Sequence, residues 1–143
     1  MQGNLANKSR RSLFVFEMFG TMFLTLLYRT FLQESMGAGP LPFFFVFWMI
    51  TMMTARISGA HYNPAVTFVC MFKRDNEENF PKSLGFVYIL AQFIGAFAGA
   101  MLSYFLLGNG GSLNILPGYV FQAIVLETLA SFLVLLVFLI LNE

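Results

Sequence analysis

The sequence predicts an all-α membrane protein with four membrane-spanning helices and one short helix that enters the membrane without crossing it. Its 143 residues are 58% hydrophobic and only 10% charged, whereas about a quarter of the residues in a typical soluble domain are charged. Four apolar stretches each approach the roughly 20 residues that a helix needs to cross a bilayer. A fifth, more polar stretch lies between the second and the third.

The composition also excludes several function classes. With a net charge of +1, the chain has no basic surface suited to nucleic acid. A single cysteine, Cys70, excludes an internal disulfide and a cysteine-based metal cluster. One histidine and few acidic residues leave no catalytic constellation, so we expect no enzyme activity, no metal and no cofactor.

The first candidate span comprises residues 13–32, which follow a basic tail at 1–12. A basic tail before an apolar run also fits a cleaved signal peptide, but Glu17 lies inside the run and no small-residue cleavage pattern follows. The remaining candidate spans are 41–57, 83–107 and 119–141.

Glu17 requires a partner, because a carboxylate inside a span is costly unless it faces the protein interior. It could be a protonated or snorkelling side chain near the end of the span. The alternative is a buried acceptor for the backbone N–H groups of the irregular stretch 57–65. Gly20 and Thr21, one turn later, form a small polar face that another segment could approach closely.

The stretch 57–67 reads Ile-Ser-Gly-Ala-His-Tyr-Asn-Pro-Ala-Val-Thr and predicts a turn that feeds a helix start. Asn63 is a favoured N-cap, and Pro64 then occupies the first helical position, where its missing N–H has no cost. The predicted half-helix covers 63–72. Such a helix, entered through irregular backbone, offers a polar path through a membrane; an ordinary capped loop at the interface is the plainer alternative.

The basic residues predict the orientation. Loops 33–40 and 108–118 contain no lysine or arginine, so the positive-inside rule places both outside the cytoplasm. The N-terminus, the 73–82 connector and the C-terminus are then cytoplasmic. Six basic residues lie in the tail or the connector: Lys8, Arg10, Arg11, Lys73, Arg74 and Lys82.

A short internal repeat relates the first and fourth spans. Glu17 to Leu24 and Glu127 to Val134 share a glutamate, a small residue, a hydroxyl residue and an apolar residue at matching offsets. An odd number of crossings separates the two segments, so they enter the membrane from opposite sides. This is the inverted-repeat arrangement of many transport proteins, although eight positions can also match by chance.

These motifs together resemble the aquaporin (major intrinsic protein) family over nearly all of 13–141. The 57–67 stretch resembles the family's first signature, and Glu17 with Gly20 and Thr21 resembles its first-helix motif. Residues 88–100, which include the packing glycines Gly95 and Gly99, resemble its third helix, and Glu127 resembles the opening of its second repeat. The implied fold is an aquaporin-like helical bundle with a first repeat at 13–107, an extracellular loop at 108–118 and the first helix of a second repeat at 119–143.

The resemblance implies a role for each matching position. The Asn63 amide would meet water or solute at the pore centre beside Pro64 and Ala65, while Gly59, Ala60 and His61 would offer backbone carbonyls. Phe43, or Phe44 one residue on, would form part of the selectivity constriction. Leu24 and Val134 would line the pore wall, and Glu17 and Glu127 would brace the two half-helix loops.

The sequence departs from the family pattern after the fourth span. It shows no second Asn-Pro-Ala, no fifth or sixth span and no filter arginine, so we expect a fragment, a truncated product or an incomplete gene model. Two functions stay open: part of a channel for water or small neutral solutes such as glycerol, or a non-conducting subunit that associates with full-length relatives. The resemblance implies a lipid bilayer as surroundings and a homo-tetramer if the complete protein is made.

Overall fold

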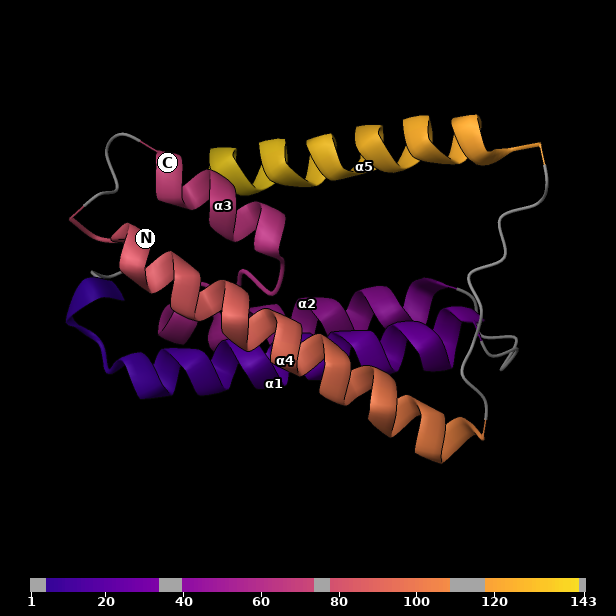
Figure 1. The fold of residues 1–143 in the computed structure, drawn as a ribbon, viewed down its shortest axis with the longest axis horizontal. Helices are drawn as coiled ribbons and strands as arrows, with labels where there is room; N and C mark the ends of the chain where they lie inside the picture. The colour runs from indigo at the N-terminus through magenta and orange to yellow at the C-terminus, as the bar shows by residue number, and fades with distance from the viewer. Residues whose placement is uncertain (1–4, 34–39, 74–77, 109–117, 142–143) are drawn as a thin grey trace. The chain divides into compact units, whose positions relative to one another are not determined.

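The computed structural model describes residues 5–33, 40–73, 78–108 and 118–141, which are mostly helical and contain no strand. The long helices are α1 (Arg10–Tyr28), α2 (Pro40–Ser58), α4 (Lys82–Leu107) and α5 (Val120–Leu141) (Figure 1). A nine-residue helix, α3 (Pro64–Phe72), follows α2. Four helices in the described ranges are long and apolar enough to cross a membrane, which confirms the predicted fold class.

The helix boundaries are close to the predicted ones, with one difference in winding. The first helix begins at Arg10 and changes after Tyr28 into a short π-helix, η2 (Arg29–Gln33). Most of the predicted loops 33–40 and 108–118, and the middle of the 73–82 connector, lie outside the described residues. Gly108 ends α4 in a left-handed conformation, a common way to stop a helix.

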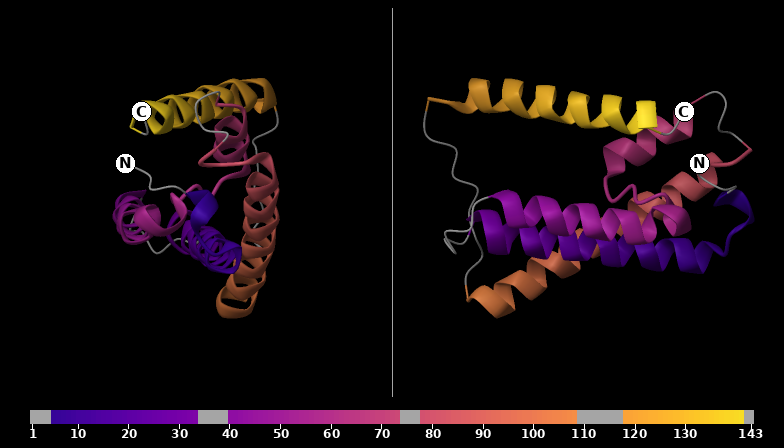
Figure 2. Two further views of the ribbon diagram at one scale, coloured as in Figure 1. Left: turned by 90° about the vertical axis from the view of Figure 1, so that its left-hand side faces the viewer. Right: turned by 180° about the vertical axis from the view of Figure 1, so that it is seen from behind.

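Helices α1 to α4 belong to one compact unit, residues 2–111, in which α1 packs mainly against α4 and also against α2. Figure 2 shows α1 and α2 side by side with α4 crossing them obliquely. Two glycines allow the close approach of α4 to α1. A Cβ on Gly95 would collide with the carbonyl of Met18, and one on Gly99 with the carbonyl of Met22. The packing glycines Gly95 and Gly99 therefore lie where the two backbones meet.

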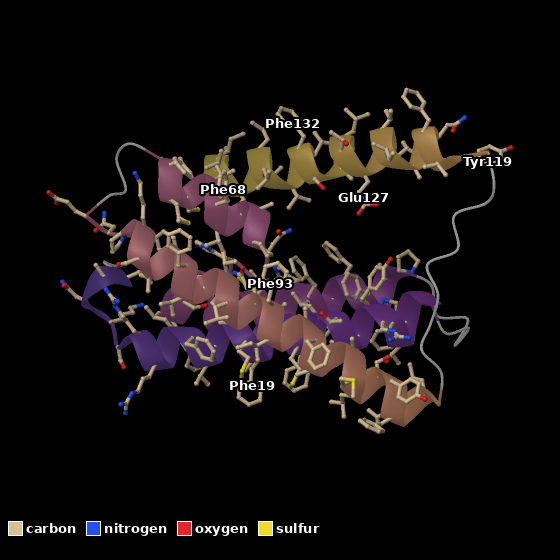
Figure 3. The ribbon with its side chains drawn as sticks, viewed as in Figure 1. Phe19, Phe68, Phe93, Tyr119, Glu127 and Phe132 are labelled. Atoms are coloured by element: carbon tan, nitrogen blue, oxygen red, sulfur yellow. The ribbon has the colours of Figure 1, made fainter. Side chains whose placement is uncertain are left out.

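Apolar side chains cover much of the outside of this unit. Phe19 on α1 is 46% exposed and Phe93 on α4 is 64% exposed (Figure 3). In water these side chains would be a severe liability, whereas in a bilayer they face hydrocarbon. The buried interior, in contrast, is partly polar and includes Glu17 and Gln92.

Helix α5 falls in a second unit of the chain. Its sequence is the most apolar of the four candidate spans, and none of the residues in its most apolar window is buried. Glu127 projects from its side (Figure 3) and is exposed.

Candidate functional site

The polar stretch between α2 and α3 is an irregular loop, residues 59–63, with unusual backbone geometry. Gly59, Ala60 and Tyr62 have φ values of 86°, 50° and 48°, in the left-handed region. Non-glycine residues rarely adopt this conformation unless the surrounding structure holds them there. Residues 58–62 are all buried, so buried polar contacts hold this loop in its conformation.

Glu17 supplies much of that support from α1. Its Oε1 accepts hydrogen bonds from the His61 amide at 3.1 Å and the Ser58 hydroxyl at 2.7 Å. Its Oε2 accepts from the Tyr62 amide at 2.8 Å. Glu17 is fully buried, and a buried carboxylate that accepts several hydrogen bonds at once avoids most of the cost of leaving water. The structure thus brings Glu17 to the loop that the sequence paired with it.

Gln92 on α4 completes this polar cluster. Its Nε2 donates to Glu17 Oε2 and to the Thr67 hydroxyl, both at 2.9 Å. Thr67 in turn lies 3.2 Å from His61 Nδ1. The side chains of three helices, α1, α3 and α4, therefore converge on the same few atoms, and the loop is fixed from several directions.

The last turn of α2 explains why the loop can exist at all. Had the helix continued, the amides of residues 60, 61 and 62 would have bonded to the carbonyls of residues 56, 57 and 58. Instead the Ala60 amide donates to the Ser58 hydroxyl at 3.2 Å, and the next two amides donate to Glu17. The Ser58 carbonyl accepts from the Tyr88 hydroxyl at 2.6 Å. The helix ends here because side chains take over its backbone partners.

Tyr62 fixes the loop against α1 and α2. Its ring occupies the space that a Cβ on Gly20 would need, and its hydroxyl is hydrogen-bonded to Thr54 on α2. The absence of a side chain at Gly20 therefore makes room for the Tyr62 ring of the loop, as the small polar face in the sequence suggested. Thr21 uses its hydroxyl on its own helix, donating to the Glu17 carbonyl at 2.8 Å.

Helix α3 begins as the sequence predicts. Asn63 is the N-cap, its Oδ1 accepts from the Ala65 amide at 2.8 Å, and Pro64 occupies the first helical position. Asn63 and Ala65 are exposed, whereas Val66 and Thr67 are buried. Within the described residues, the carbonyls of Gly59 and Ala60 accept no hydrogen bond from another backbone amide. The loop thus combines a capped helix start with carbonyls that no backbone amide of the described residues uses.

The remaining sequence-predicted residues lie apart from this loop. Phe43 is half-buried near the start of α2, with its ring edge-on to Tyr28 at 6.0 Å and stacked on Phe47 at 6.3 Å. Phe44 is 59% exposed. Leu24 is half-buried on α1. On α5, which is described by itself, Glu127 and Val134 are both exposed.

Sequence reasoning missed several members of the cluster. Gln92 is a polar residue in the middle of an apolar span, and that signal alone marks it as a candidate for the interior. Thr67 carries no such signal, because a threonine hydroxyl in a membrane helix can bond to its own backbone. Tyr88 carries none either, because tyrosine is common in membrane helices near the interface. Nothing in the order of residues indicated that Lys8, in the tail, reaches the end of α2.

Comparison with known proteins is consistent with these features. The family model described as major intrinsic protein matches residues 13–143. The propanediol uptake facilitator PduF of Salmonella typhimurium is 49% identical over 59 residues, which are 38% of this chain and 19% of the relative. The probable aquaporin AqpM of Archaeoglobus fulgidus is 39% identical over 90 residues, 57% of this chain and 35% of the relative.

A probable glycerol uptake facilitator protein of Thermotoga maritima is 46% identical over 56 residues, 39% of this chain and 22% of the relative. The chain thus spans about a third or less of the length of these curated relatives. No solved structure matches it. The family model covers nearly the whole chain, and the chain belongs to the major intrinsic protein family.

Proposed function

We propose that this chain forms the N-terminal part of a channel through which water or small neutral solutes such as glycerol pass down their gradients. The observation that carries the proposal is the loop 59–63 and the start of α3. The capped helix start, the left-handed backbone and the unused carbonyls lie together, and Glu17 holds them in place. The printed names of the relatives, which include an aquaporin and two uptake facilitators, support the same substrate class.

In this proposal the loop supplies both kinds of polar group that a neutral solute needs. The Asn63 amide acts as donor at the narrow centre, because its Oδ1 is engaged by the Ala65 amide and its NH₂ group is thereby oriented. Pro64 and Ala65 form the helix end beside it. The carbonyls of Gly59, Ala60 and His61 act as successive acceptors along one half of the path.

The wall of the path is apolar in the proposal. Leu24 on α1 and Val134 on α5 line it, so that a solute exchanges water contacts for a few polar ones only. Phe43 narrows one mouth. Its edge-on contact with Tyr28 limits the rotation of its ring, which suits a residue that sets a pore diameter.

Glu127 is proposed to support a second loop in the way that Glu17 supports the first. Both glutamates precede a small residue and a hydroxyl residue at the same offsets. The exposed carboxylate of Glu127 in the described part of the chain is compatible with a partner outside it. We further propose that the N-terminus and the 73–82 connector are cytoplasmic, and that the complete protein assembles as a homo-tetramer in the bilayer.

Complementation tests the proposal. The chain is co-expressed with the portion of the Archaeoglobus relative that follows its fourth span, reconstituted into vesicles, and challenged with an osmotic step. We expect permeability above that of vesicles with either part alone, and its loss with Asn63→Leu. The control is Glu78→Gln, an exposed residue of the connector, which should leave permeability unchanged.

The second candidate function is a non-conducting subunit that associates with full-length relatives. The exposed apolar surfaces of α2 and α5 favour association with further helices. In the same assay this function gives co-purification of the two parts without any rise in permeability, and Asn63→Leu then has no effect.

A further inference from the structure

The N-terminal tail is attached to the end of α2 by Lys8. Its ammonium group donates to the carbonyl of Arg56 and, at 3.0 Å, to the carbonyl of Ile57. These two carbonyls lost their helical partners when the amides of residues 60 and 61 turned to Ser58 and Glu17. Lys8 therefore takes up the acceptors that the bent loop leaves behind, at the helix end where a positive charge is favourable.

Two further contacts hold the tail in the same place. Leu5 is only 3% exposed although it lies in a polar segment. The amide of Ala6 donates to the carbonyl of Asn79 at 3.0 Å. The short 3₁₀ turn η1 (Leu5–Asn7) thus packs on the end of the connector between α3 and α4.

The residue that follows Asn79 links this contact to the loop. Phe80 is buried, and its ring lies 5.1 Å from the ring of His61 and 5.1 Å from that of Tyr88. Tyr88 in turn donates to the Ser58 carbonyl. The tail therefore contacts the α2 end that leads into the loop, and it contacts Asn79, the residue before the aromatic ring that packs on His61.

We propose that residues 5–8 of the N-terminal tail form a clasp that holds the loop 59–63 in position. Lys8 is the residue of the clasp that binds the end of α2. When Lys8 is bound, the last carbonyls of α2 are satisfied and the loop stays in its left-handed conformation. When Lys8 is released, those carbonyls compete for the amides of residues 60 and 61, and the loop opens locally. The inference goes beyond the proposed channel function, since it needs no transport to be true.

Hydrogen–deuterium exchange in lipid nanodiscs tests the clasp. Lys8→Met keeps the length of the side chain and removes its charge and donors. We expect the amides of residues 59–62 to exchange about tenfold faster in this variant, while those of 95–103 in α4 keep the parent rate. Lys8→Arg should restore slow exchange. The matched control is Arg11→Met, an exposed basic residue of the same tail, which should not change it.

A cross-link provides an independent arm that keeps Lys8 in place. In a Cys70→Ala background, Ala6→Cys with Asn79→Cys should form a disulfide on mild oxidation, because the two backbones are hydrogen-bonded. With Lys8 present, the disulfide should leave the exchange of 59–62 at or below the parent rate. Combined with Lys8→Met, it should not slow the exchange, because the carbonyls of Arg56 and Ile57 still lack the Lys8 donors; restored slow exchange would show that the position of the tail, and not Lys8, holds the loop. Equal acceleration in the loop and in 95–103, unchanged exchange in Lys8→Met, or failure of the cross-link to form would each overturn the clasp. None of these outcomes depends on whether the chain conducts.

Discussion

At the scale of single residues, Glu17 is the main support of the loop 59–63. Its two oxygens serve donors from three segments: the end of α2, the loop and Gln92 on α4. A carboxylate can accept about four hydrogen bonds, so one buried side chain satisfies the whole set. An apolar residue of similar size would remove the acceptor of the Ser58 hydroxyl and of the His61 and Tyr62 amides, and would leave Gln92 with Thr67 alone.

The first prediction follows from this arrangement. Glu17→Ala should lower the free energy of unfolding by about 1–3 kcal/mol for each buried donor left unpaired. Glu17→Gln should lower it less, because one side-chain oxygen remains as acceptor. The measurement is the unfolding midpoint in mixed detergent micelles, with Glu78→Ala, an exposed glutamate, as control. A Glu17→Ala variant as stable as the parent would remove this role.

Asn63 provides the second prediction. Asn63→Ala removes the oxygen that caps α3 and should destabilise the helix start by about 0.5–2 kcal/mol. Asn63→Asp keeps an oxygen for the Ala65 amide and should retain most of that stability. In the complementation assay, however, both variants should lose permeability, since neither keeps the side-chain NH₂ group. Equal permeability of Asn63→Asp and the parent would show that the amide donor is not used.

The sequence identified the acceptor at this scale but not its full set of donors. Glu17 stands out because any carboxylate in a span needs a reason, and the loop stands out because its residues favour turns and caps. Which other side chains contact Glu17 and the loop depends on how α4 crosses α1. The local sequence carries no signal of that crossing. Gln92 and Tyr88 acquire their roles only through that crossing.

At the scale of helices, close backbone packing between α1 and α4 sets the geometry of the cluster. Gly95 lies against the carbonyl of Met18, and Gly99 lies against that of Met22. Met18 directly follows Glu17 on α1, and Gly95 lies about one turn after Gln92 on α4. Gly95 and Gly99 lie four residues apart, so they share one helix face and allow a close approach there. The π-turn after Tyr28 was not predictable, because no residue there disrupts an α-helix.

The third prediction concerns that seam. Gly95→Ala should destabilise the protein by about 1–3 kcal/mol, because the new methyl group meets backbone atoms that cannot move aside cheaply. Phe97→Leu, at a side chain that is 68% exposed two residues later, should have little effect. Both variants are compared by unfolding in the same micelles. If the two variants unfold alike, α1 and α4 do not approach as closely as described.

At the scale of the whole molecule, the tail and the connector lie at the same end of the α1–α4 unit. The hydrogen bond between Ala6 and Asn79 joins them directly. Their cytoplasmic location, inferred from their basic residues, stays a prediction. The sequence predicted four spans and the half-helix. It could not predict a partner for α5, because a helix this apolar has little pattern that would distinguish one of its faces.

The fourth prediction is topological. With Cys70→Ala as background, a cysteine at Ser112 should react with an impermeant reagent added outside intact cells, and one at Glu78 should react only after permeabilisation. The reason is the bias of lysine and arginine toward the tail and the connector. Equal labelling of both positions in intact cells would contradict the proposed orientation.

The most direct test of the central claim is the osmotic water permeability of vesicles that contain the 143-residue chain alone. The described part of the chain holds one half-helix, α3, and irregular backbone at membrane depth needs protein or a water-filled cavity around it. A second copy could supply the opposing half only by inserting upside down. We therefore predict permeability no higher than that of an unrelated four-span protein, rising only when the complementary part is added. Robust permeability of the chain alone, abolished by Asn63→Leu, would contradict the account.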